Sequence, residues 1–91
     1  MDRERIESRI REISASRKNV RFEELVSLLD THISALFTPY NHHGNPHHAF
    51  TIGNVTFNIA KPRKGCVKKV YVDAFLEAME SLGLWNREDQ P

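Results

Sequence analysis

Hydrophobic and polar residues alternate along residues 47–60, and this alternation predicts a β-hairpin. Gly53-Asn54 divides the stretch into two alternating segments, and a two-residue loop of this kind is a strong hairpin signal. The loop places Phe50 opposite Phe57 and sets the register of every other pair. The face predicted to pack on a core carries His48, Phe50, Ile52, Val55, Phe57 and Ile59. The opposite face carries His47, Ala49, Thr51, Thr56 and Asn58, so His47 is predicted to face solvent or a ligand.

Apolar residues recur at helical spacing in three other segments. These stripes predict amphipathic helices over residues 2–15, 21–32 and 70–82. Asn19 is the best capping side chain near the start of the second helix. We expect Gly83 to end the third helix in a left-handed conformation, with Leu84 supplying the hydrophobic contact that usually accompanies it.

The segment between the second helix and the hairpin carries a weaker signal. Alternation predicts a strand over 34–39 that ends at Pro39, and composition predicts a loop over 41–46. The expected fold is therefore α+β, a three-stranded antiparallel sheet with helices on one face, leaving the other face open. Double-stranded-RNA-binding domains share this plan, without the extra N-terminal helix. We divide this single domain into a helical extension (1–18), a core (19–84) and a polar tail (85–91).

Charge is segregated along the chain, although the net charge of its 91 residues is only +1. Residues 31–60 contain no Asp, Glu, Lys or Arg, and all five histidines lie there. A basic block without an acid among its members follows: Lys61, Arg63, Lys64, Lys68 and Lys69. A basic block beside a histidine-bearing strand favours an anionic ligand such as RNA. With one cysteine, Cys66, no apolar run near 20 residues and no visible secretion signal, we expect a cytoplasmic protein without membrane contact.

Three segments of the chain resemble the HicA toxins, the RNA-cleaving halves of HicA/HicB toxin–antitoxin pairs. They are Asn19–Leu29, Gly44–Phe50 and Lys64–Leu76. The resemblance covers about residues 19–82, with the segments in the right order and at similar spacing. It implies a small fold similar to a double-stranded-RNA-binding domain, an activity that cleaves messenger RNA without a metal or other cofactor, and a HicB-like antitoxin as partner.

HicA toxins use a histidine in a Gly-Ser-His-like motif at the start of the second strand. That histidine corresponds to His47, and Gly44 corresponds to the glycine of the motif. Pro46 stands at the serine position, so the hydroxyl group of the motif is missing here. The resemblance therefore implies that His47 acts as the acid or base, because imidazole titrates near neutral pH, and that the basic block contacts phosphate.

Two other interpretations stay open at this stage. The chain can be a non-catalytic RNA-binding domain of the same fold, as the proline at position 46 suggests, with His47 an ordinary exposed histidine and the basic block a solvated loop. It can also bind a transition metal through His42, His43, His47 and His48. We expect no physiological metal site, since no cysteine or carboxylate lies near these residues in sequence. His48 is expected to be packed and hydrogen-bonded, and His42 and His43 are expected in a loop.

Overall fold

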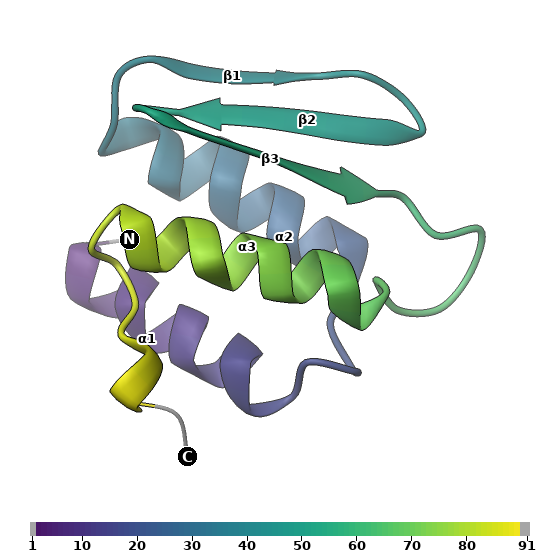
Figure 1. The fold of residues 1–91 in the computed structure, drawn as a ribbon, viewed down its shortest axis with the longest axis horizontal. Helices are drawn as coiled ribbons and strands as arrows, with labels where there is room; N and C mark the ends of the chain where they lie inside the picture. The colour runs from purple at the N-terminus through teal and green to yellow at the C-terminus, as the bar shows by residue number, and fades with distance from the viewer. Residues whose placement is uncertain (1, 90–91) are drawn as a thin grey trace.

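Three antiparallel strands form a sheet that carries the α-helices on a single face (Figure 1). The computed structural model describes residues 2–89. The elements are α1 (Arg3–Ala15), α2 (Phe22–Ser27), the π-helical turn η1 (Leu28–His32), the 3-10 turn η2 (Ile33–Ala35), β1 (Tyr40–His43), β2 (His47–Ile52), β3 (Val55–Ala60), α3 (Lys69–Ser81) and the 3-10 turn η3 (Arg87–Asp89). The α+β class predicted from the sequence is confirmed.

The hairpin of β2 and β3 has the predicted register. Phe50 pairs with Phe57, Ile52 with Val55, and the pairing continues without a break to the opposite end of both strands. β2 is the central strand, because β1 pairs with its other edge. The phenyl rings of Phe50 and Phe57 stack with their centroids 5.3 Å apart on the helical face. The opposite face of the sheet is left open, as predicted.

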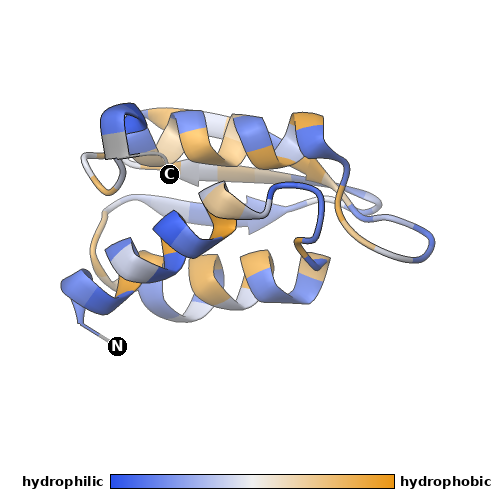
Figure 2. Ribbon diagram, turned by 90° about the horizontal axis from the view of Figure 1, so that it is seen from below, coloured by the Kyte–Doolittle hydropathy of each residue, from blue (hydrophilic) through white to orange (hydrophobic). Residues whose placement is uncertain are grey.

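The helical layer is two helices deep. Figures 1 and 2 show α2 and α3 lying against the sheet and α1 crossing beneath them. The predicted isoleucine stripe of α1 is buried in the single hydrophobic core, which joins it to the sheet through the stripes of α2 and α3. Each fully buried aliphatic side chain contributes about 1.5–3 kcal/mol relative to an exposed one. The second predicted helix starts as α2 and continues to His32 as the π-helical turn η1.

α3 ends in the way the sequence predicts. Gly83 has a φ of +76°, and its N–H donates to the carbonyl oxygen of Glu80 over 3.1 Å. The N–H of Leu84 donates to the carbonyl oxygen of Met79 over 2.9 Å, which completes a Schellman motif. Leu84 is buried and provides the predicted hydrophobic contact.

Two predictions about the segment before the hairpin are wrong. The predicted strand over 34–39 is not formed: η2 extends the helical path because Ile33 is fully buried in the core. The predicted loop over 41–46 is instead the strand β1 followed by a tight turn. Gly44 makes this turn possible with a φ of +97°. The N–H of Gly53 donates to the carbonyl oxygen of Pro39 over 2.8 Å, which ties the start of β1 to the hairpin.

Two smaller predictions also fail. Asn19 is exposed and does not cap α2: Arg21 is the N-cap residue, and the carboxylate of Glu24 accepts a hydrogen bond from its N–H over 3.3 Å. The tail predicted as polar begins with a buried residue, Trp85, whose ring lies 5.7 Å from the guanidinium carbon of Arg17. Burial of the indole surface outweighs the polar character of its neighbours. Residues 90–91 of the predicted tail lie outside the described residues.

Candidate functional site

His47 is the first residue of β2 and is exposed on the open face of the sheet. The alternation of the strand fixes this orientation, because His48 and Phe50 point towards the helices. The backbone around it is held on both sides: its Cα pairs with that of Ala60, and Pro46 accepts a hydrogen bond from the N–H of Lys61 over 2.9 Å. The prediction that His47 faces outward is confirmed.

A pocket of about 470 Å³ lies beside His47, and we call it the His47 pocket. Its volume falls in the range of small-ligand sites, roughly 300–1,000 Å³. It is lined by His47, Ala60, Lys61, Pro62, Arg63, Lys64, Cys66, Lys68 and Tyr71. The structure therefore brings the predicted histidine together with four of the five residues of the basic block. The lining contains no acidic residue, so the pocket favours an anion.

The loop between β3 and α3 shapes this pocket through one buried anchor. Val67 is buried in the core, and its N–H donates to the carbonyl oxygen of Val20 over 2.8 Å. Gly65, with a φ of +82°, turns the chain just before this anchor. Lys64 and Lys68 therefore leave the fold on either side of a fixed point and remain exposed. Lys68 is also the N-cap residue of α3, whose positive dipole end adds to the field at the pocket.

The five basic residues do not contribute equally. The ammonium group of Lys69 donates to Asp73 over 2.9 Å, and Lys69 does not line the pocket. This hydrogen bond, supported by Arg17, holds the pKa of the Asp73 carboxyl below its usual value. Lys61 lines the pocket, but its ammonium group lies 5.9 Å from the ring centroid of Phe22, which belongs to α2. The cations left to the pocket, without a salt bridge among the described residues, are Arg63, Lys64 and Lys68.

Gly44 lies immediately next to the candidate catalytic residue in space. A side chain at Gly44 would collide with the carbonyl oxygen of His47, so only glycine fits this turn without a shift of the β2 backbone. Its role in this chain is to let β1 turn directly into the strand that carries His47.

The second histidine of the pair, His48, belongs to a polar network on the helical face. Its Nδ1 lies 2.8 Å from Nε2 of His42, and Nδ1 of His42 lies 2.9 Å from a carboxylate oxygen of Asp30. The hydroxyl group of Tyr40 donates to the same carboxylate. The prediction of a packed, hydrogen-bonded His48 is confirmed, whereas the prediction that His42 and His43 lie in a loop is wrong, because both belong to β1. The spacing of two residues between Tyr40 and His42 indicates that both side chains point to the same face, once β1 is recognised as a strand.

Burial separates the chemistry of the two adjacent histidines. Burial lowers the pKa of His48, and electrostatic interactions with His42 and Lys61 lower it further, against the opposing effect of the Asp30 carboxylate. Nε2 of His48 is buried and has no hydrogen-bond partner among the described residues, and its ring meets the edge of Phe22 at a centroid distance of 4.8 Å. His48 is therefore a structural residue, whereas His47 is exposed.

The four histidines considered as metal ligands do not converge. His42 and His48 point to the helical face, whereas His43 and His47 are exposed on the open face. Within residues 2–89, no group of three or more His, Cys, Asp or Glu side chains is arranged to hold a metal ion. The structure therefore gives no support to the metal-binding interpretation.

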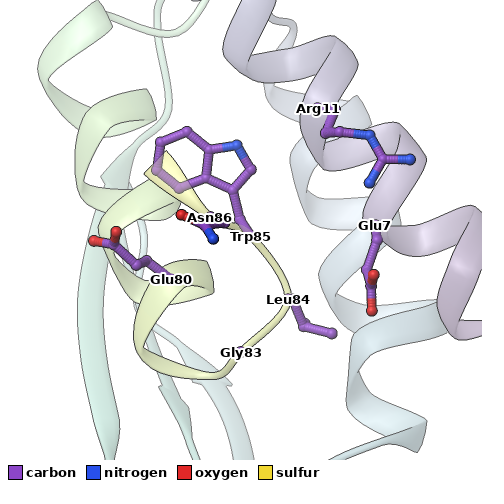
Figure 3. Close-up of a pocket in the computed structure, with 7 residues that line it drawn as sticks. All are labelled: Glu7, Arg11, Glu80, Gly83, Leu84, Trp85 and Asn86. Carbon is purple, nitrogen blue, oxygen red and sulfur yellow. The ribbon is translucent and has the colours of Figure 1, made fainter. Parts of the chain in front are cut away.

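Another hollow, of about 350 Å³, lies between α1 and the segment after α3 (Figure 3). Its charged lining mixes Glu7 and Glu80 with Arg11, so it has no preference for one sign of charge. In Figure 3 Trp85 projects from the segment after α3, and its ring is buried as part of the core. The hollow has no histidine and no cluster of cations, so it lacks the features that make the His47 pocket a candidate site.

Comparison with models of protein families, with curated proteins and with solved structures gives no match. None of the helices in the described part of the chain has the length and apolar character needed to cross a bilayer. The function is therefore inferred from the geometry of the His47 pocket and from the resemblance of its residues to a known motif.

Proposed function

We propose that this protein is an endoribonuclease toxin of the HicA type that cleaves messenger RNA at the His47 pocket. The observation that carries the proposal is the pocket itself, where an exposed strand histidine meets Arg63, Lys64 and Lys68 without any acidic side chain. The resemblance to HicA segments, with the histidine at the start of the second strand, supports the same assignment, as does the three-stranded sheet with an open face. A HicB-like antitoxin that covers the pocket completes the proposal.

RNA supplies its own nucleophile, so the chain needs to provide only proton transfer and positive charge. His47 takes the proton of a ribose 2′-hydroxyl group, and the 2′-oxygen attacks the adjacent phosphorus. The bond from phosphorus to the 5′-oxygen breaks, and the 5′-oxygen takes a proton from solvent or from protonated His47. The products are a 2′,3′-cyclic phosphate and a 5′-hydroxyl end. Arg63, Lys64 and Lys68 offset the negative charge that develops on the phosphoryl oxygens.

A specific observation favours a second candidate, a domain that binds RNA without cutting it. Pro46 removes the hydroxyl group that precedes the histidine in HicA toxins. Among the described residues no side chain makes a hydrogen bond to the imidazole of His47, so its ring is not oriented by a neighbour. The cationic lining of the pocket would still bind phosphate in such a domain.

The decisive experiment incubates the purified protein with a long single-stranded RNA and analyses the ends of any fragments. Proton transfer by a positioned side chain contributes about 10²–10⁴-fold, so His47→Ala should cut at least about 100-fold more slowly than wild type. His43→Ala is the matched control, because His43 is exposed on the same face but does not line the pocket. It should cut like wild type.

Three results separate the candidates. Fragments that end in a 2′,3′-cyclic phosphate and depend on His47 support the ribonuclease. Binding of RNA by wild type without any fragment supports the non-catalytic domain. Equal cutting by wild type and His47→Ala refutes a catalytic His47.

A further inference from the structure

β3 is an edge strand with its outer side unpaired. The sheet order is β1-β2-β3, so β3 pairs only with β2 within the described residues. The N–H of Lys61, just after the end of β3, donates to the carbonyl oxygen of Pro46. Hydrogen-bonded residues alternate along an antiparallel strand, so the odd-numbered residues of β3, including Phe57, also bond to β2. The N–H and C=O groups of Thr56, Asn58 and Ala60 therefore point away from the sheet.

This edge lacks the usual protection against another strand. β3 is six residues long, carries no charged residue and no proline, and pairs with β2 without a bulge. Natural proteins usually block such edges with lysine, proline, a bulge or a short strand. The other edge of this sheet follows that rule, because β1 has only four residues and begins next to Pro39. The unpaired N–H and C=O groups on the outer side of β3 are therefore available to bond to another extended segment.

A groove of about 430 Å³ runs along the free edge between β3 and α3. Its floor and walls come from Val55, Thr56, Phe57, Asn58, Val70, Tyr71, Ala74, Glu77, Ala78 and Ser81. Val70 is 65% exposed, which is the largest exposure of a bulky hydrophobic side chain among the described residues. The small side chain of Ala74 lies near the middle of the groove's helical wall and leaves room for close approach.

Charge along this groove changes sign from one end to the other. α3 runs opposite to β3 (Figure 1), so Glu77 lies towards the start of β3 and Lys68 towards its end. Glu77 is exposed and makes no salt bridge within residues 2–89, and Lys68 likewise makes none. The groove has Glu77 towards one end and is apolar in the middle, and Lys68 lies just beyond its other end, where it lines the neighbouring His47 pocket. This order of charges is complementary to a second copy of the chain turned end to end.

We propose that two copies of this chain associate through their β3 strands, antiparallel about a two-fold axis at Asn58, to form one six-stranded sheet. In this arrangement Thr56 pairs with Ala60 of the partner subunit, and the two Asn58 residues pair across the axis. Glu77 approaches the partner subunit's Lys68, and Val70 becomes covered. The interface leaves the open face of the sheet free and shares Lys68 with the His47 pocket, but the proposal does not rest on the function proposed for that pocket.

The association predicts a change of mass together with a change at named backbone amides. Light scattering of the full chain at rising concentration should show the mass increasing from 10.5 kDa towards twice that value. Amide hydrogen exchange should slow at Thr56, Asn58 and Ala60 as the dimer forms. The amides of Phe57 and Ile59 bond to β2 already and should be equally protected at all concentrations, which provides an internal control.

One charge on the axis should weaken the dimer. Asn58→Lys places two like charges directly opposite each other and should weaken association by up to about fivefold. Asn58 is exposed, so the variant should fold, and an unchanged circular dichroism spectrum checks this. Asn41→Lys is the matched control on β1, also exposed but at the other edge, and should dimerise like wild type. A wild-type protein that stays monomeric at millimolar concentration refutes the proposal, and so does a dimer in which the three outer amides still exchange freely.

Discussion

The difference between Lys68 and Lys69 gives a quantitative test of the His47 pocket. Lys68 lines the pocket and has no salt bridge among the described residues, whereas the neighbouring Lys69 is bound to Asp73 over 2.9 Å. If RNA binds in the pocket, Lys68→Gln should weaken binding markedly and Lys69→Gln only slightly. The two variants differ by one position in the chain and remove the same charge, so each serves as the control for the other.

The magnitude follows from the number of phosphate-binding cations. Arg63, Lys64 and Lys68 are available to single-stranded RNA, and each contributes about −0.7 to the slope of log K against log salt concentration. Wild type should therefore show a slope of about −2, so affinity falls about 20-fold between 50 and 200 mM salt. Lys68→Gln should reduce the slope to about −1.4, and Lys69→Gln should leave it near −2.

The assay is fluorescence anisotropy with a labelled single-stranded RNA in which 2′-deoxynucleotides prevent cleavage. Affinities are measured for the three proteins between 50 and 300 mM salt. A slope near zero for wild type would show that the pocket does not bind phosphate. Equal slopes for Lys68→Gln and Lys69→Gln would show that the structure assigns the cations wrongly.

Three further predictions concern the scaffold that holds the site. Burial lowers the pKa of His48 in the folded state, so this histidine binds a proton more readily in the unfolded chain, where its pKa is about 6.5. The free energy of unfolding should therefore fall as pH drops below about 6.5. Urea unfolding of His48→Phe should show a smaller fall, and an identical fall would exclude this histidine as the cause. Phe50 is fully buried, so Phe50→Ala should cost about 3–5 kcal/mol and lower Tm by tens of degrees in a thermal melt followed by circular dichroism; a loss below about 1 kcal/mol would contradict the central place of this ring. Gly83 has a φ of +76°, so Gly83→Ala should cost about 1–2 kcal/mol in chemical denaturation, and an unchanged midpoint would argue against the left-handed cap.

The hairpin and the helices could be predicted because their signals are local. The Gly53-Asn54 loop fixes the register of β2 and β3 by itself, and the orientation of His47 follows directly. The apolar stripes of α1 and α3 and the cap at Gly83 likewise depend on residues close in sequence. β1 was missed because its four residues, Tyr40–His43, are polar in composition and become a strand only by pairing with β2.

The parts of the site that depend on tertiary contacts could not be predicted. The network of Asp30, His42 and His48 joins residues from η1, β1 and β2, and no sequence pattern records that they meet. The basic block was predicted to act as a unit. In the structure, burial of Val67 and the start of α3 at Lys69 direct its side chains to different surroundings. Lys68 falls on the pocket and Lys69 falls beside Asp73.

The most direct test of the central claim follows the imidazole rings themselves by NMR while the non-cleavable RNA is added. The account predicts that the ring signals of His47 shift with saturation, whereas those of His43, exposed on the same face outside the pocket, do not. Ring signals of His47 that remain unchanged when RNA is fully bound would contradict the account, because the RNA would then occupy another surface.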